Sequence, residues 1–123
     1  MSSFSVDMGI PEMRDFWLEL KSKAESGKAS KNELKLYKKL GKALNLIARD
    51  PRYPGLKTHE ISALTERFGE KVWESYLENN NPSAGRLFWV YGPGRRHITI
   101  IGWSPHPDDK SVAYSQIKLS RAE

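Results

Sequence analysis

The sequence predicts an α+β fold. In this fold an N-terminal helical hairpin packs on one face of a small, curved, mainly antiparallel sheet of three to four strands, and a short C-terminal helix follows. Apolar residues recur at helical spacing between positions 11 and 49, and strand-like runs separated by turn formers occupy positions 71–103. Helices followed by antiparallel strands are typical of the α+β class. We expect a single domain over residues 1–123, with residues 1–27 as an N-terminal extension and first helix.

The first helix is expected to begin at Pro11, because the first helical position does not need the backbone N–H that proline lacks. Residues 1–10 precede it as a loose lead-in, and Gly27 supplies a C-terminal stop. The apolar side chains that share one stripe of this helix are Phe16, Leu20 and Ala24.

The second helix is expected to begin at a capping box. In this motif the Ser30 and Glu33 side chains each accept a hydrogen bond from the backbone N–H of the other residue. The helix ends at Asp50, since the residue before a proline disfavours the α conformation. Its apolar positions recur at helical spacing and are Tyr37, Leu40, Leu44 and Ile47. The short turn between the helices indicates an antiparallel helical hairpin with a shared apolar seam.

The remaining chain alternates between strand-like runs and turn formers. We expect a short strand at 56–61, a helical turn at 62–69, a strand at 71–78, a loop at 79–85, a hairpin from 86–91 and 97–103, and a helix at 108–119.

The composition is that of a soluble protein with an uneven positive charge. The 123 residues include no cysteine, which excludes disulfides and thiolate metal sites. No signal peptide is visible and no apolar run approaches about 18 residues, so we expect a cytoplasmic protein without a membrane span. The net charge is +5, and residues 21–57 hold eleven Lys or Arg against three acidic residues. Such a field favours a polyanionic partner, although a solvated helix face is the more ordinary interpretation of the lysines themselves.

Three segments together carry a resemblance to a known family: "DPRYPGLKTHEI", "KVWESYLENNNPSAGRLFWVYG" and "HITIIGWSPHP". They resemble the RelE/ParE superfamily of toxins from bacterial type II toxin–antitoxin modules. The resemblance runs from about Leu34 to Leu119 and depends on element order and on an arginine that opens an aromatic strand. Residues 1–27 depart from the compact family members, which commonly begin with a strand.

The resemblance implies a toxin that binds RNA across the open face of its sheet. RelE-type members cleave mRNA, commonly in the ribosomal A site, by attack of the 2′-hydroxyl on the adjacent phosphate without a metal or other cofactor. The implied partners are a cognate antitoxin, mRNA and the ribosome. ParE-type relatives share the fold and inhibit DNA gyrase instead, and a non-catalytic RNA-binding domain is a third hypothesis.

Metal-free RNA cleavage needs a base, an acid and positive charge at the phosphate. Arg86 matches the family arginine that contacts the scissile phosphate, and a guanidinium holds phosphate oxygens bidentately. The alternative is a surface arginine that pairs with Glu74 or Glu78 across the sheet. Strand alternation places Arg86, Phe88 and Val90 on one face, predicted to be open, and Leu87, Trp89 and Tyr91 on the apolar other face.

Glu74 and Tyr76 share a strand face, so Glu74 is a candidate general base and Tyr76 a candidate stacking or hydroxyl-donating group. A glutamate on a half-exposed strand also occurs without any function, and Glu60 is a second candidate. RelE-type members carry lysines on the matching strand, so this chain departs from them toward variants that employ a glutamate.

His106, in "SPHPDD", is the candidate general acid, because histidine titrates near neutral pH; a simple turn residue is the alternative. The neighbouring Asp108 and Asp109 suit a helix start better than a metal site, so no metal is expected. His97 is expected to be solvated. The residues expected to contact RNA are Lys57, Arg95 and Arg96 through phosphates, and Tyr114 by stacking, although a packing tyrosine is an equal alternative there.

Overall fold

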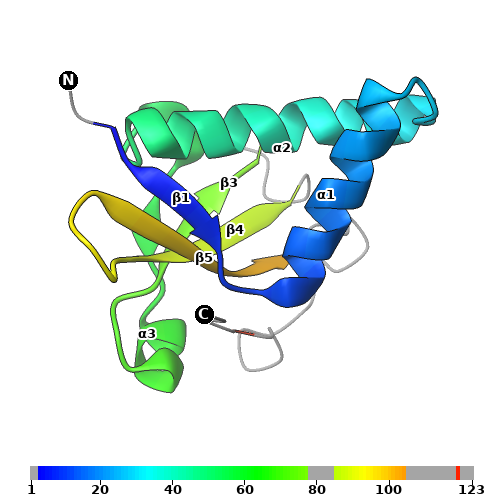
Figure 1. Ribbon diagram of the computed structural model, residues 1–123. Helices are drawn as coiled ribbons and strands as arrows, with labels where there is room; N and C mark the ends of the chain where they lie inside the picture. Colours follow the sequence, from blue (N-terminus) through cyan, green and yellow to red (C-terminus); the bar gives the residue numbers. More distant parts are fainter. Residues whose placement is uncertain (1–2, 78–84, 105–118, 120–123) are drawn as a thin grey trace.

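The computed structural model describes residues 3–77, 85–104 and 119. Within these residues the chain forms a five-stranded sheet (Figure 1). Helices α1 and α2 cover one face of the sheet, and α3 lies on the other face. The strand order is β1-β5-β4-β3-β2; β1 is parallel to β5, and the other neighbours are antiparallel. The elements are β1 (Ser5–Met8), α1 (Pro11–Glu25), α2 (Lys31–Arg49), the 3-10 helix η1 (Pro54–Leu56), β2 (His59–Glu60), α3 (Ser62–Phe68), β3 (Trp73–Tyr76), β4 (Arg86–Tyr91) and β5 (His97–Ser104).

The prediction of a mainly antiparallel sheet of three to four strands is wrong. Residues expected as a loose lead-in form β1, which pairs in parallel with β5 from Ser5 to Met8, so the sheet of the described chain is mixed and has five strands. The four residues of β1 contain two apolar side chains, Val6 and Met8, that pack on the main core. A local pattern of this length does not distinguish a strand from a loop, and the parallel partner lies some ninety residues away in the sequence.

The predicted helical hairpin is also wrong, because α1 and α2 diverge instead of lying side by side (Figure 1). Ring packing explains the path of α1. Phe16 lies against Trp103 of β5, with ring centroids 5.1 Å apart, and Trp17 stacks on Tyr37 of α2 at 5.2 Å. Helix α1 therefore bridges the sheet and the first turns of α2. The predicted C-terminal helix lies outside the described residues, apart from Leu119.

Two apolar cores lie on the two faces of β4, which is buried on both sides. Leu87 and Trp89 belong to the larger core, which includes Leu40 and Ile47 of α2. The intervening Phe88 and Val90 belong to a smaller core with side chains that include Leu64 of α3. The expectation that the Phe88 and Val90 face is open is therefore wrong, because α3 covers part of it. Period-two alternation itself is present as predicted.

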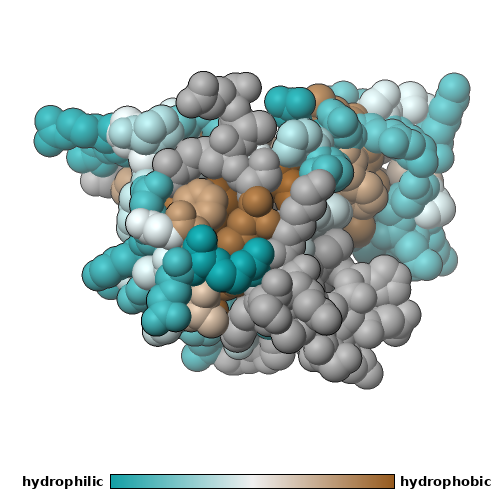
Figure 2. Space-filling model, turned by 90° about the horizontal axis from the view of Figure 1, so that it is seen from below, coloured by the Kyte–Doolittle hydropathy of each residue, from teal (hydrophilic) through white to brown (hydrophobic). Residues whose placement is uncertain are grey.

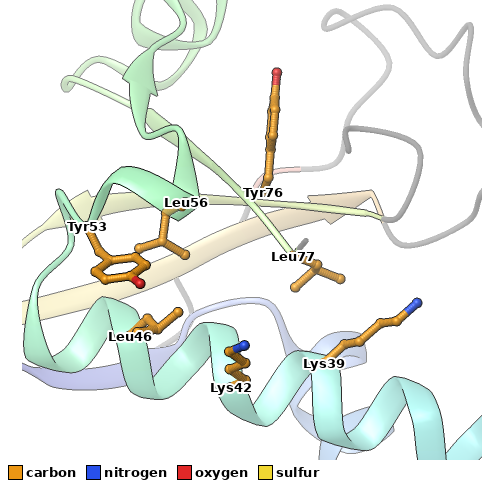
Figure 3. Close-up of a pocket in the computed structure, with 8 residues that line it drawn as sticks. Lys39, Lys42, Leu46, Tyr53, Leu56, Tyr76 and Leu77 are labelled. Atoms are coloured by element: carbon orange, nitrogen blue, oxygen red, sulfur yellow. The ribbon is translucent and has the colours of Figure 1, made fainter. Parts of the chain in front are cut away.

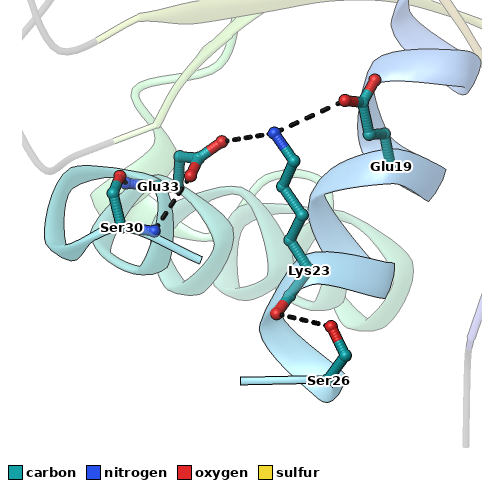
Figure 4. A network of polar contacts seen from close by, with 5 residues as sticks. All are labelled: Glu19, Lys23, Ser26, Ser30 and Glu33. Atoms are coloured by element: carbon teal, nitrogen blue, oxygen red, sulfur yellow. Dashed lines mark hydrogen bonds and ion pairs between the residues drawn. The ribbon is translucent and has the colours of Figure 1, made fainter. Parts of the chain in front are cut away.

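The capping box at the start of α2 is confirmed. Ser30 Oγ accepts a hydrogen bond from the Glu33 backbone N–H at 3.1 Å, and Glu33 Oε1 accepts one from the Ser30 N–H at 2.9 Å (Figure 4). Glu33 Oε2 also pairs at 2.9 Å with Lys23 of α1, which in turn reaches Glu19 at 3.4 Å. This network joins α1 to α2.

The Ser30 N–H, followed by Lys23, lowers the pKa of Glu33 below its ordinary value of 4.5. Because the folded pKa is the lower one, the contribution of Glu33 to stability is complete above pH 4.5 and is lost as the pH falls through the folded pKa.

Replacing Ser30 by Ala should lower the free energy of unfolding by about 1 kcal/mol, because one of the first backbone N–H groups of α2 loses its acceptor. Urea unfolding at pH 7 measures this loss. Ser22→Ala, at an exposed position of α1, is the matched control and should be neutral or slightly stabilising, because Ala has the higher helix propensity. Equal effects of the two substitutions would contradict the role of the cap.

Candidate functional site

Ionisable side chains from three adjacent strands meet on the sheet face turned away from α2. Glu74 lies in β3, between His59 of β2 and Phe88 of β4, its two directly paired neighbours. Arg86 of β4 is paired with Tyr76 and is diagonal to Glu74. Directly paired residues point to the same face of a sheet, so the register brings His59, Glu74 and Arg86 together.

The carboxylate of Glu74 has a basic partner on each oxygen. His59 Nε2 lies 3.1 Å from Oε1, and Arg86 Nη1 donates a hydrogen bond to Oε2 at 3.2 Å. The Glu74 side chain is 2% exposed, whereas the exposed fractions are 15% for Arg86 and 47% for His59. A carboxylate this deeply buried needs such partners, because burial of an unpaired charge is strongly unfavourable. The open member of this cluster is therefore His59.

The two ring nitrogens of His59 both face acceptors. Nδ1 lies 2.7 Å from the backbone carbonyl oxygen of Lys57, so this nitrogen is the donor in that bond. Nε2 faces the Glu74 carboxylate. The geometry is satisfied when a second proton lies between Nε2 and Oε1, carried either by the imidazole or by the carboxyl group. When Nε2 carries a proton it donates to Glu74 Oε1, so His59 is the group that can exchange a proton at the surface of the site.

Arg86 is held in a fixed orientation. Its guanidinium carbon lies 5.7 Å from the centroid of the Phe88 ring, and its Nη1 is tied to Glu74. The expectation that this side chain faces solvent is wrong, because it is mostly buried. The alternative prediction, that Arg86 pairs with Glu74 across the sheet, matches this ion pair. The same ion pair also holds the guanidinium in one position.

A chain of hydroxyl groups holds the opposite face of β3. Trp89 Nε1 donates to Ser75 Oγ at 2.9 Å, Ser75 bonds to Thr58 Oγ1 at 2.7 Å, and Thr58 donates to the Pro51 carbonyl at 2.7 Å. Trp89 Nε1 can only donate a hydrogen bond, and the Pro51 oxygen can only accept one. The direction of every bond is therefore fixed, and Ser75 donates to Thr58. Thr58 precedes His59, so this chain fixes the backbone that carries the imidazole.

Tyr76 and Lys57 border the cluster. The rings of Tyr76 and His59 meet edge to face with centroids 6.1 Å apart. Figure 3 shows Tyr76 pointing away from α2, while the next residue, Leu77, points toward that helix. Lys57 is exposed and has left-handed backbone geometry, with φ of 51°, which directs its carbonyl to His59. Tyr76 therefore lies beside His59 and Arg86, and Lys57 meets the cluster through its backbone carbonyl.

Other predicted residues lie elsewhere. Glu60 accepts a hydrogen bond from Thr65 of α3 at 2.9 Å. His97, expected to be solvated, is half-buried and hydrogen-bonded to Asp7 of β1. Arg95 and Arg96 are exposed at the β4–β5 hairpin, at the opposite end of β4 from Arg86. His106 and Tyr114 lie outside the described residues, as do Asp108 and Asp109.

Sequence reasoning did not select His59 as a site residue. The signal that identifies it is register: His59 is opposite Glu74 only because β2 and β3 pair across an intervening helix, α3. Figure 2, seen from the side away from α2, shows hydrophobic residues gathered near the centre of this face with hydrophilic residues next to them.

In the described part of the chain, no cluster of three or more His, Cys, Asp or Glu side chains has the arrangement to hold a metal ion. None of the helices described is both long and apolar enough to span a membrane. Comparisons with protein-family models, with curated proteins and with solved structures give no match for this chain.

Removal of the carboxylate alone should destabilise the fold more than removal of the whole ion pair. Glu74→Leu takes the carboxylate partner from the mostly buried Arg86 charge, and we expect a loss of about 3 kcal/mol in the free energy of unfolding. Glu74→Leu combined with Arg86→Met should lose less, because the double variant leaves no half of the pair behind. Urea unfolding of both variants and of Arg86→Met completes the double-mutant cycle.

The matched control is the same cycle on Lys23 and Glu33, whose side chains are 40% and 36% exposed and whose coupling should be much smaller. Strictly additive losses at Glu74 and Arg86 would show that the two side chains do not stabilise each other.

Proposed function

We propose that this chain is the toxin of a bacterial type II toxin–antitoxin module and acts as a metal-independent endoribonuclease that cleaves mRNA on the ribosome. The observation that carries the proposal is the cluster of His59, Glu74 and Arg86 on the sheet face away from α2. This cluster unites an exposed proton carrier with a fixed guanidinium, and these are two of the three groups that the reaction needs.

In the proposed reaction, the 2′-oxygen attacks the adjacent phosphorus and loses its proton. The bond from phosphorus to the 5′-oxygen breaks, leaving a 2′,3′-cyclic phosphate on one fragment and a 5′-hydroxyl on the other. The proton held between His59 and Glu74 goes to the departing 5′-oxygen. His59 delivers it, because its side chain is 47% exposed while that of Glu74 is 2% exposed.

Glu74 acts in this proposal as a positioning residue instead of the general base suggested by the sequence. Its two oxygens orient His59 and Arg86, and it does not need to touch the substrate. Arg86 stabilises negative charge on the phosphate in the transition state. His106, predicted from the sequence as the general acid, is reassigned in this proposal to take the 2′-hydroxyl proton. Tyr76 and Lys57 are retained for contacts with the nucleotide.

The element order supports the RelE/ParE resemblance. The family members commonly begin with a strand, and β1 supplies one at Ser5–Met8, ahead of α1 and α2. The departure noted for residues 1–27 is thereby reduced. The proposed partners, a cognate antitoxin and the ribosome, follow from this resemblance, as does the proposed place of action in the cytoplasm.

His59→Gln should reduce the rate of RNA cleavage by about 10²- to 10⁴-fold, because Gln keeps hydrogen-bonding capacity but does not transfer a proton. The measurement follows mRNA 5′ ends, with and without translating ribosomes, and tests the fragments for 2′,3′-cyclic phosphate. Growth after induced expression in bacteria gives the parallel readout. An unfolding curve close to wild type confirms that the variant folds.

His97→Gln is the matched control, because His97 also pairs with a carboxylate, that of Asp7, but lies in β5. It should cleave like wild type. Equal activity of wild type and His59→Gln would remove the proposed site. Inhibition of DNA supercoiling by gyrase, with all transcripts intact, would replace nuclease action by the gyrase-directed alternative.

A further inference from the structure

A second basic surface lies at the hairpin end of β4, apart from the Glu74 cluster. It is an open groove of about 580 Å³, lined by Phe4, Asp50, Pro51, Arg52, Tyr91, Arg95 and Arg96. Arg86 and Tyr91 are the first and last residues of β4, and five steps along a strand separate them by about 17 Å. Tyr91 also packs on rings of the α2 side of the sheet. The groove is therefore a separate site.

Tyr91 forms a fixed aromatic platform in this groove. It is 39% exposed, although its ring contacts three others, with centroid distances of 5.0 Å to Trp89, 5.9 Å to Phe4 and 6.3 Å to Trp73. Such packing restricts the ring to one orientation before any ligand arrives. An exposed aromatic ring held in this way is suited to stack on a nucleobase.

Three exposed arginines surround the platform. Arg52 is oriented by Trp73, with its guanidinium carbon 5.3 Å from the ring centroid, and Arg95 and Arg96 project from the hairpin. The acidic residue in the lining, Asp50, accepts a hydrogen bond from the Arg52 backbone N–H at 3.1 Å and so serves the turn. The charge of the lining is net positive, which suits phosphate groups.

Arg96 has a backbone conformation that other residues adopt at lower cost. Its φ is 54°, in the left-handed region where glycine is unstrained, and its carbonyl accepts a hydrogen bond from the Ser5 N–H at 2.8 Å. A glycine would supply the same carbonyl without the conformational cost. The presence of arginine at such a position points to a role for its side chain.

We propose that this groove binds single-stranded nucleic acid, with one base stacked on Tyr91 and the flanking phosphates held by Arg52, Arg95 and Arg96. A single strand presents flat bases and phosphates together, which matches an aromatic platform bordered by guanidinium groups. An acidic peptide offers carboxylates without the flat partner, and a duplex keeps its bases inside the stack. That the natural strand is RNA rests on the proposed function; the groove itself does not depend on cleavage.

The test uses a fluorescent single-stranded oligodeoxythymidine, which has no 2′-hydroxyl and so remains intact even if the chain is a ribonuclease. Binding is followed by fluorescence anisotropy over a range of salt concentrations. Arg96→Gly should bind more weakly and reduce the slope of log affinity against log salt by about 0.7, the value for one phosphate contact on a single strand. Its thermal midpoint should equal or exceed that of wild type, because glycine relieves the left-handed conformation.

Two substitutions at one position test stacking. Tyr91→Leu should weaken binding by about 5- to 100-fold, and Tyr91→Phe should bind like wild type, because it retains the ring. Lys28→Ala is the matched control for loss of one charge. It removes an exposed lysine from the turn between α1 and α2, remote from the hairpin (Figure 1), and should leave affinity unchanged within about twofold.

Three results would overturn the proposal: equal binding by Arg96→Gly and Lys28→Ala, unchanged binding by Tyr91→Leu, or equal affinity of wild type for a duplex of the same length. The second of these results, if dependence on Arg96 remains, would mark a general polyanion surface. If transcripts stay intact while Tyr91 and Arg96 still determine binding, the nuclease proposal fails and this one stands.

Discussion

The buried carboxylate of Glu74 is the constraint on which the geometry of the sheet face depends. A carboxylate 2% exposed requires donors at both oxygens, and its partners come from different strands, β2 and β4. Strand β2 has two residues, so its backbone ladder is short. Side-chain contacts complete its attachment: His59 to Glu74 on one face, and Thr58 to Ser75 on the other. Consecutive residues of β3 thus hold the edge strand from both sides, and β3 fixes where the imidazole lies.

The parts of the fold that could be predicted from the sequence are those set by neighbouring residues. Local signals were sufficient for the capping box of Ser30 and Glu33 and for the alternation along β4, since both depend on residues a few positions apart. They were insufficient for β1, whose partner is β5, and for the path of α1, which is set by rings from other elements. Pattern indicates what a segment can form, and long-range pairing decides what it packs against.

The same distinction applies to the site. Residue types and alternation selected Glu74 and Tyr76, and the RelE/ParE resemblance added Arg86; the structure brings these three residues together. His59 required the register of β2 with β3 across α3, which no local pattern contains. Arg95 and Arg96 were predicted, like Arg86, to contact RNA phosphates, but the length of β4 separates them from Arg86. Positive charge in the sequence therefore does not predict how many basic surfaces form or where they lie.

The two basic sites differ in how they hold their arginines, and this difference bears on what each can do. Arg86 lies on a strand, between a carboxylate and the Phe88 ring, so its orientation is set before a ligand binds. Stabilisation of a transition state requires such preorganisation, because reorientation during the reaction would cost part of the stabilisation. Arg95 and Arg96 are exposed on a hairpin and can follow a flexible strand. A held guanidinium beside a histidine suits chemistry at one phosphate, whereas exposed charge around a fixed ring suits retention of a longer polymer.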